Sequence, residues 1–76
     1  MSNAKSDVNA ERINQDLKWG EQNHSPEKWM IIIGEEFGET CKEILEEDNE
    51  KYREELVQLT ASCLAALECF DRNKEK

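Results

Sequence analysis

Four side chains with oxygen ligands stand in two pairs, each at a spacing of three residues. Glu36 precedes Glu39 in one segment, and Glu55 precedes Gln58 in another. Residues three apart on a helix project from neighbouring positions, so each pair would point in one direction. Antiparallel packing of the two helices would bring the pairs together at one edge of the core. Three carboxylates and one amide oxygen would then converge.

Such a concentration of negative charge favours a cation. Carboxylates that are held close together and partly away from water repel one another and raise one another's pKa values. A divalent ion removes this repulsion, and hard oxygen ligands suit Mg²⁺, with Mn²⁺ as an alternative. Helical bundles build metal sites from glutamates on facing helices in this way.

The same pairs also have a simpler explanation. The chain holds 18 acidic residues among 76, and glutamate is a strong helix former, so pairs at helical spacing arise by chance. Two glycines favour the site, because Gly34 and Gly38 inside a helix each cost about 1 kcal/mol relative to alanine. That cost indicates that a helix or a ligand approaches their face. We expect five further glutamates to be solvated surface residues: Glu43, Glu46, Glu47, Glu50 and Glu68.

Three helices are expected to position these side chains. The first is predicted from Asp7 to Trp19, with Ala10, Ile13 and Leu17 on one apolar stripe at helical spacing. Gly20 follows, and glycine commonly stands just past a helix end. A polar loop of residues 21–24 leads to the second helix.

The second helix is predicted to begin at Ser25-Pro26-Glu27 and to run to about Glu46. Serine can cap the free amides, proline suits the first turn, and glutamate favours the positive helix end. Its apolar face comprises Met30, Ile33, Phe37, Cys41, Ile44 and Leu45. The third helix, capped by Asp48 or Asn49, has an apolar stripe of Tyr52, Leu56, Leu59, Cys63, Ala66, Leu67 and Phe70.

These elements predict an all-α fold, an antiparallel bundle of three helices per chain. The short connection between the second and third helices requires them to pack antiparallel. A chain this small buries only about 60% of its unfolded surface, so we expect a homodimer or a tetramer to complete the core. The third-helix stripe and the Gly34 face would form the seam. Residues 1–6 are expected to be an expression-tag remnant and a disordered N-terminus, residues 7–72 the domain, and residues 73–76 a charged tail.

Composition limits the partners and the location. A net charge of −8 argues against a nucleic-acid polymer, because such binding depends on cationic neutralisation of phosphates. A single nucleotide can still bind through a metal ion. No stretch approaches the ~20 apolar residues of a membrane span, and no signal-peptide pattern is present. The chain has three cysteines, an odd number, and all lie in apolar stretches: Cys41, Cys63 and Cys69. This pattern predicts free core thiols, rather than disulfides, in a cytoplasmic protein.

The order of these features resembles a known family. The resemblance rests on Lys18-Trp19-Gly20-Glu21-Gln22, Trp29, Glu35-Glu36-Phe37-Gly38-Glu39, Glu54-Glu55-Leu56-Val57-Gln58 and Leu67-Glu68. Together they are similar to the MazG-like all-α nucleoside triphosphate pyrophosphohydrolases, over about residues 11–72. The resemblance implies a Mg²⁺-dependent enzyme that cleaves NTP or dNTP between the α and β phosphates. The products would be the monophosphate and pyrophosphate, as in housecleaning of the nucleotide pool.

The metal ligands implied by this resemblance are Glu36, Glu39 and Glu55. Gln58 stands where the family pattern has aspartate, and this is the main departure from the pattern. A glutamine carbonyl can coordinate Mg²⁺, but it supplies no charge. Glu35 and Glu36 are the candidate catalytic residues, with Glu35 as a general base or as a residue that supports the ligands.

Three residues near the end of the first helix are candidates for binding the nucleotide. Trp19 lies off the apolar stripe of its helix and can stack on a base, while Lys18 can meet phosphate. Gln22, or Asn23 beside it, can bond the base edges. Alternatively, Trp19 packs against the second helix or a partner subunit. Trp29 begins the apolar face of the second helix and is expected in the core.

Two other functions stay open. Gln58 favours a relative of the family that binds a nucleotide or a partner protein without turnover. A helical dimerisation module with an accidental acid cluster is the third possibility. We favour the enzyme, because the carboxylate spacing and the order of the family's features agree.

Overall fold

The computed structural model describes residues 3–74, which form three α-helices and no β-strand. The helices are α1 (Ala4–Trp19), α2 (Pro26–Leu45) and α3 (Asn49–Asn73). The predicted all-α class and the number of helices are confirmed. Residues 1–2 of the expected tag remnant and residues 75–76 of the expected charged tail lie outside the described residues. Within residues 3–74 no helix is long and apolar enough to cross a membrane.

The start of α1 differs from the prediction. The helix begins at Ala4 rather than near Asp7, so the expectation of a disordered segment is wrong for residues 3–6. The side chain of Asn3 accepts a hydrogen bond from the Ser6 amide at 2.9 Å. An asparagine cap of this kind satisfies an otherwise free amide and stabilises the first turn.

The other helix ends follow the local signals in the sequence. Gly20 adopts a φ of 71° after α1, a conformation that glycine tolerates without strain. Ser25 accepts from the Lys28 amide before α2, and Asp48 caps α3 from the equivalent position. At its far end α3 remains helical to Asn73, one residue beyond the predicted end of the domain at residue 72.

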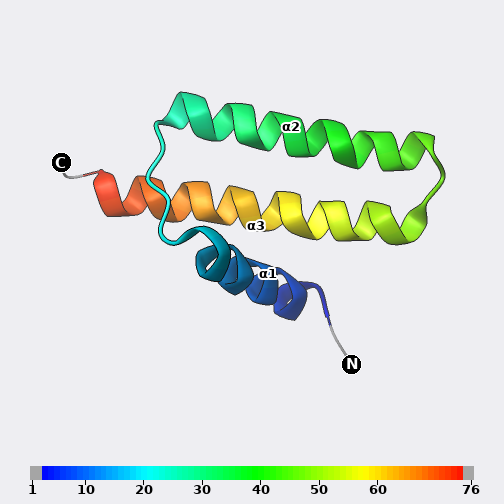
Figure 1. Ribbon diagram of the computed structural model, residues 1–76, viewed down its shortest axis with the longest axis horizontal. Helices are drawn as coiled ribbons and strands as arrows, with labels where there is room; N and C mark the ends of the chain where they lie inside the picture. Colours follow the sequence, from blue (N-terminus) through cyan, green and yellow to red (C-terminus); the bar gives the residue numbers. More distant parts are fainter. Residues whose placement is uncertain (1–2, 75–76) are drawn as a thin grey trace.

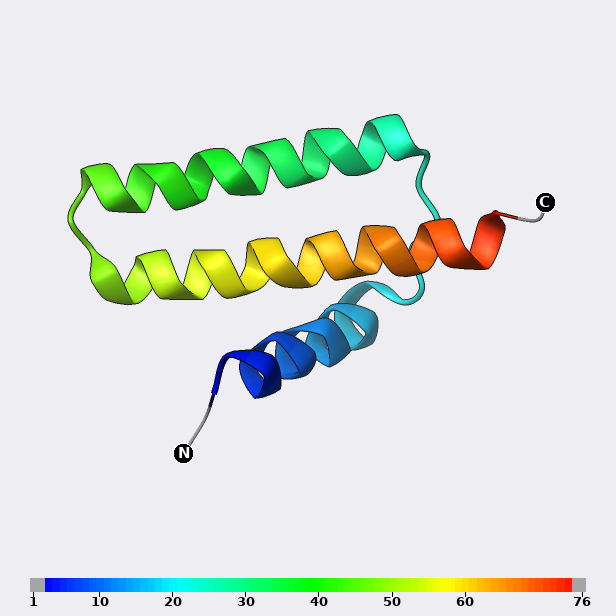
Figure 2. The ribbon, with the colours of Figure 1, turned by 180° about the vertical axis from the view of Figure 1, so that it is seen from behind.

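A tight turn makes α2 and α3 antiparallel. Glu47 has a φ of 57°, its amide bonds the Ile44 carbonyl at 3.1 Å, and the Asp48 amide bonds the Glu43 carbonyl at 3.1 Å. This pair of bonds is the Schellman arrangement, which satisfies the last carbonyls of a helix. The chain therefore reverses within three residues, and α2 and α3 run side by side over their lengths (Figures 1 and 2).

The central element is α3, against which both α1 and α2 pack. Figure 1 shows α2 along one side of α3 and α1 along the other. Among the described residues α1 and α2 each pack on α3 but not on each other. The three helices thus form a single layer with α3 in the middle, and only the contact strips along α3 are covered.

The apolar core is correspondingly small. Its buried members are Trp29, Ala65 and Cys69, and the half-buried Ile32 and Ala66 pack against them. The Trp29 ring meets the His24 ring edge to face, with 4.9 Å between centroids. The prediction that Trp29 is a core residue is confirmed.

The cysteine prediction holds only in part. All three thiols are free in the described chain, but only Cys69 is buried. Cys41 is half-buried and Cys63 is exposed. The interpretation of every cysteine as a core residue is therefore wrong for Cys63, which lines a surface groove between α2 and α3 instead of the core.

The predicted core face of α1 is wrong. Ile13 is 61% exposed and Leu17 is 81% exposed, whereas Gln15 is only 6% exposed. Polar contacts decide which face docks on α3. Arg12 forms an ion pair with Glu68 at 2.7 Å, so Glu68 is not the free surface residue that we expected. A second ion pair joins Asp7 to Arg53 at 2.8 Å, and the Gln15 side chain donates a hydrogen bond to Ser62 of α3.

The predicted apolar face of α2 is also largely exposed. Met30, Phe37 and Ile44 show 58–64% of their surface, and Leu45 at the helix end shows 84%. The side of α2 that packs on α3 is rotated from this predicted face. It carries Trp29, Ile32, Glu36 and Thr40. Exposed Leu67 and Phe70 of α3 border the same groove as Met30 and Ile33. We call these six side chains the apolar face: Met30, Ile33, Phe37, Ile44, Leu67 and Phe70.

The small core makes its tryptophan the most sensitive position for stability. We expect Trp29→Ala to lower the free energy of unfolding by about 3–5 kcal/mol, the usual cost of removing a large buried aromatic side chain. A chain of this size has roughly 4–11 kcal/mol in total. Trp19→Ala is the matched control, because Trp19 is 58% exposed, and it should cost less than about 1 kcal/mol. Urea denaturation followed by circular dichroism measures both, and equal losses would contradict the assignment of the core.

Candidate functional site

Glutamates of α2 and α3 come within range of one another's charge. Burial raises the pKa of Glu36, and the charges of Glu39, Glu55 and Glu11 raise it further, against an opposing hydrogen bond from Ser62. All three carboxylates predicted as metal ligands therefore contribute to one electrostatic environment. The antiparallel packing of α2 on α3 produces this convergence, because it places the segment of α2 with Glu36 and Glu39 beside the segment of α3 with Glu55.

The pKa of Glu55 is raised as well. Burial is the largest cause, followed by the charges of Glu39, Glu43 and Glu54, and only Lys51 acts in the opposite direction. The negative charge of Glu39 raises the pKa of both Glu36 and Glu55. Such mutual repulsion is relieved by protonation or by a bound cation.

One member of this group was missed from the sequence. Glu43 was expected to be solvated, but it is half-buried, and its Oε2 atom is covered without a hydrogen-bond partner in the described chain. The Oε2 atom of Glu55 is in the same state. Glu43 follows Glu39 by four residues, so helical spacing places both on the same side of α2. We call Glu36, Glu39, Glu43 and Glu55 the carboxylate cluster.

The cluster suits a divalent cation in chemistry but not in preformed geometry. Its donors are hard carboxylate oxygens, and two of them are buried without a proton donor. However, no three acidic, histidine or cysteine side chains among residues 3–74 lie close enough together to hold a metal ion. Glu39, for example, is exposed on the rim. Binding of a cation would therefore require the glutamate side chains to change rotamer, so that their carboxylates move closer together.

A cleft opens beside the cluster where the three helices meet. Its volume is about 240 Å³, and Glu36 and Gln58 both line it. Trp19 and Gln22, two of the residues predicted to bind substrate, form another part of its wall. We call this space the three-helix cleft. It brings four of the predicted site residues together around one cavity.

Other predicted residues lie outside the cleft. Glu35 is exposed and is not among the cleft's lining residues. Lys18 is also exposed, with its Nζ atom 5.3 Å from the centre of the Trp19 ring. Asn23, the alternative to Gln22, is occupied by Arg72, whose Nη2 atom donates to the Asn23 Oδ1 at 3.0 Å. Asn23 is therefore held in the loop and is a poor candidate for a base contact.

Gln58 and Glu55 have different neighbours, although they are three residues apart on α3. Glu55 is turned toward the carboxylates of α2, whereas Gln58 lines both the three-helix cleft and a second pocket between α1 and α3. It is exposed, and Glu11 of α1 lines the same two pockets. The Gln58 amide thus lies on the α1 side of the molecule.

A buried polar pair was also missed from the sequence. Gln15 is 6% exposed and Ser62 is 5% exposed, and the Gln15 Nε2 atom donates to the Ser62 Oγ atom at 3.3 Å. Both residues line the three-helix cleft. The only sequence signal was a serine within the small-residue row of α3, between Ala61 and Ala65.

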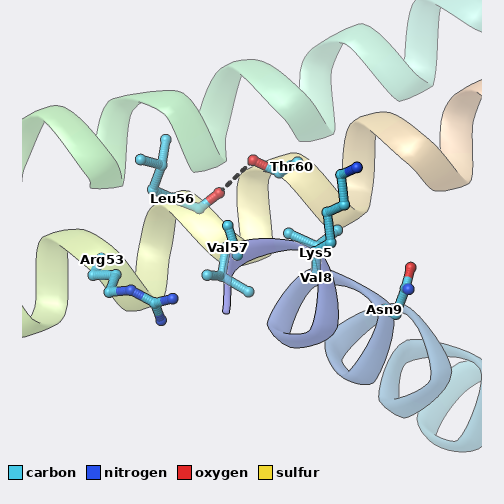
Figure 3. A pocket seen from close by; sticks show the side chains of 8 residues that line it. Lys5, Val8, Asn9, Arg53, Leu56, Val57 and Thr60 are labelled. Carbon is cyan, nitrogen blue, oxygen red and sulfur yellow. Dashed lines mark hydrogen bonds between the residues drawn. The ribbon is translucent and has the colours of Figure 1, made fainter. Parts of the chain in front are cut away.

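A further groove, between the start of α1 and α3, holds no predicted site residue (Figure 3). It has a volume of about 440 Å³ and is lined by apolar Val8, Leu56 and Val57, with Arg53 and Lys5 at its rim. The Thr60 hydroxyl is bonded to the Leu56 carbonyl at 2.8 Å, so it is not directed at a ligand. Most of the residues that the sequence predicted for a site lie at the carboxylate cluster and the three-helix cleft instead.

The raised pKa values of Glu36 and Glu55 predict a pH-dependent stability. Relative to an ordinary value of 4.5, the folded chain holds protons on these groups after the unfolded chain has released them. Their favourable contribution is complete below pH 4.5 and is lost as the pH rises through the raised values. We expect the Glu36→Gln, Glu55→Gln double variant to match the wild-type Tm near pH 4 and to exceed it at pH 7.5 in metal-free buffer.

Glu35→Gln is the control for this experiment, because Glu35 is exposed on the same helix. It should follow the wild type at both pH values. A double variant that is less stable than the wild type at pH 7.5 would show that the two carboxylates do not repel their neighbours in the folded chain.

Comparisons with known proteins add no relationship to these observations. The chain matches no family model, no curated protein sequence and no solved structure. The candidate site therefore rests on the residues and geometry of this chain.

Proposed function

We propose that this chain is a Mg²⁺-dependent nucleoside triphosphate pyrophosphohydrolase. It would cleave NTP or dNTP between the α and β phosphates to give the monophosphate and pyrophosphate. The observation that carries the proposal is the carboxylate cluster, in which two buried oxygens lack a partner in the described chain, beside a cleft lined by tryptophan and amide side chains. The order of motifs that resembles the MazG-like family points to the same chemistry.

The electrostatics of the cluster support a divalent ion. Glu43 and Glu55 have covered oxygens without a partner in the described chain, and the pKa values of Glu36 and Glu55 are raised, so the cluster would gain from a cation that replaces mutual repulsion with attraction. We propose Glu36, Glu39 and Glu55 as the residues that would hold Mg²⁺, or Mn²⁺ in its place, with the Gln58 carbonyl approaching from the cleft side. When bound, the ion would neutralise charge on the triphosphate and lower the pKa of a bound water.

The chain itself would supply the base that takes the proton of the attacking water. Glu36 would be held ionised by the bound Mg²⁺ as one of its ligands and would act in catalysis through the ion. Glu35 is therefore the candidate for the general base. It is exposed, but it precedes Glu39 by four residues on α2, so a rotation of its side chain would bring it to the rim of the cluster.

The three-helix cleft would hold the base of the nucleotide. Its volume of about 240 Å³ lies below the ~300–1,000 Å³ of drug-sized ligand pockets, so one heterocyclic base would fill it. Trp19 at the wall would stack on the ring, and Gln22 would bond its polar edge. Lys18, beside the Trp19 ring, would meet phosphate outside the cleft.

We also propose that two copies of the chain assemble through the apolar face, as a dimer or as half of a tetramer. Phe37, Leu67 and Phe70 are 58–60% exposed there, while the core of one chain has few fully buried side chains. A two-fold axis would place this face on its own copy and cover both. Gly34, next to this face, has no described atom within 4 Å of the position of a Cβ, so nothing in the single chain explains its cost. A partner helix would supply the close approach that we expected.

The free thiols and the net charge of −8 fit a cytoplasmic protein whose partner is a single nucleotide. The charge argues against a nucleic-acid polymer. Neither inference depends on the oligomeric state.

Pyrophosphate release from a panel of NTPs and dNTPs, with and without Mg²⁺, tests the enzymatic function. We expect release only with Mg²⁺, and a loss of at least about 100-fold in kcat/KM for Glu36→Gln and Glu55→Gln, because each removes a charged ligand. Glu46→Gln is the control, since Glu46 is exposed at the end of α2, and it should retain full activity. No release from any nucleotide would exclude the enzyme.

In the same assay, Gln58→Asp gives this position the charge of the family pattern and should increase kcat.

Calorimetry and the assay together separate turnover from binding alone. If the wild type binds a non-hydrolysable triphosphate with Mg²⁺ in calorimetry but releases no pyrophosphate, the chain is a nucleotide-binding relative without activity. If it binds no nucleotide but dimerises, the helical dimerisation module is the better description.

Charge substitutions on the apolar face test the assembly. We expect Phe37→Asp and Leu67→Asp to convert the oligomer to monomers in sedimentation equilibrium, because each places a carboxylate in an apolar seam. Leu17→Asp is the control: Leu17 is 81% exposed, but it lies on α1, and its substitution should leave the assembly intact. A wild type that is monomeric at high concentration with ordinary stability would refute the proposed interface.

A further inference from the structure

The walls of the three-helix cleft carry many hydrogen-bond acceptors and no cationic side chain. Two glutamates line it, Glu11 of α1 and Glu36 of α2, together with the amides of Gln15 and Gln22. Within the part of the chain that the structure describes, no lysine or arginine lines this cleft. An ionised carboxylate only accepts hydrogen bonds, whereas an amide both donates and accepts. The lining therefore favours a ligand whose edge supplies N–H donors.

Gln15 brings a free acceptor to the cleft. The residue is only 6% exposed, and its Nε2 atom donates to the Ser62 Oγ atom at 3.3 Å. Its Oε1 atom has no hydrogen-bond partner in the described chain, yet protein atoms do not cover it: the covered carboxylate oxygens without a partner belong to Glu43 and Glu55. Since Gln15 lines the cleft, this oxygen is open to that space. The fold thus holds a buried amide in place and leaves its acceptor unused.

Glu11 supplies a second acceptor. It is half-buried on α1, and it lines both the cleft and the neighbouring pocket between α1 and α3. The cations near it have other partners. Arg12, the next residue, pairs with Glu68, and Arg53 across the neighbouring pocket pairs with Asp7. The Glu11 carboxylate is therefore available to a ligand in the cleft.

Nucleobases differ in what they offer to such acceptors. Cytosine and adenine present an amino group beside a ring nitrogen, which places a donor next to an acceptor. An amide side chain matches this edge with two hydrogen bonds, as glutamine does with adenine in DNA. Uracil and hypoxanthine carry a carbonyl oxygen in place of the amino group. That oxygen would meet the lone pairs of Glu11 and Gln15, and buried acceptors without a donor are costly.

We propose that the three-helix cleft selects nucleobases with an amino group beside a ring nitrogen, cytosine and adenine, over their keto counterparts uracil and hypoxanthine. This inference rests on the proposed function, in which the cleft holds the base, and it names the substrate class of that site. The amino group would donate to Glu11 and to the Gln15 Oε1 atom, while Trp19 stacks on the ring. Specificity would thus come from α1, and Glu36 would stay available to the metal ion.

The test is the binding of free nucleosides, compared in pairs that differ by the exchange of the amino group for a carbonyl: cytidine with uridine, and adenosine with inosine. Nucleosides carry no phosphate, so neither Mg²⁺ nor the net charge of −8 decides the result. Binding is followed by NMR through the indole N–H signals of Trp19 and Trp29, which both line the cleft. We expect cytidine and adenosine to bind about 10-fold more tightly than their partners, because each gains a hydrogen bond to a charged acceptor.

Two variants assign this preference to its residues. Glu11→Gln and Gln15→Leu should each reduce it, since each removes one of the acceptors. Glu11→Gln keeps the size of a half-buried side chain, so it tests the preference even if the loss of the Gln15 contact with Ser62 destabilises the chain. Glu54→Gln is the matched control, because it removes the same charge from an exposed residue that lines the neighbouring pocket but not the cleft. It should leave the preference unchanged.

The outcomes also distinguish this inference from the proposed function. Equal affinities within both pairs would overturn the inference and leave the cleft as a base pocket without this selectivity. A preference that persists in both Glu11→Gln and Gln15→Leu would overturn the role of these two residues. If no nucleoside shifts the indole signals, the cleft does not hold the base and the inference is wrong, whereas pyrophosphate release with Mg²⁺ still decides the enzymatic function.

Discussion

Both α1 and α2 pack against α3, and this single layer of helices leaves the chain with few fully buried side chains. The rest of the structure depends on that shortage. Helix docking relies on polar contacts as much as on apolar ones: α1 is held by the ion pairs Arg12–Glu68 and Asp7–Arg53 and by the buried Gln15. Large apolar side chains, meanwhile, remain on the outside of α2 and α3.

The strip where α2 meets α3 has two different edges. The apolar face lies along one edge, and the carboxylate cluster lies along the other. This division follows from helical spacing on α2, where Met30 and Phe37 share one side and Glu36 and Glu43 share another. A second copy of the chain would cover the first edge without blocking the second. The proposed assembly and the proposed metal binding would thereby be compatible on one small domain.

The cluster and the three-helix cleft are physically coupled through Glu36. This residue contributes charge to the cluster and also lines the cleft, where Trp19 and Gln22 stand. An anionic substrate can approach so acidic a surface only if a cation compensates the charge. The proposed order of contacts, base in the cleft and phosphates toward the cluster, follows from where the amides and the carboxylates lie.

The sequence by itself determined the three helices, the caps at Ser25 and Asp48 and the antiparallel turn, because these depend on interactions within a few residues of one another, but the Asn3 cap that begins α1 was missed. It also predicted that Glu36, Glu39 and Glu55 would share one electrostatic environment, since helical spacing and antiparallel packing were sufficient for that. Only the tertiary structure decided which side of each helix is covered. Gln15 is buried against Ser62 of α3, whereas Ile13 and Leu17 are exposed. The local sequence could not reveal this, because the partner of Gln15 lies far away along the chain. For the same reason Glu43 joined the cluster, since its burial depends on a neighbouring helix that no local pattern reveals.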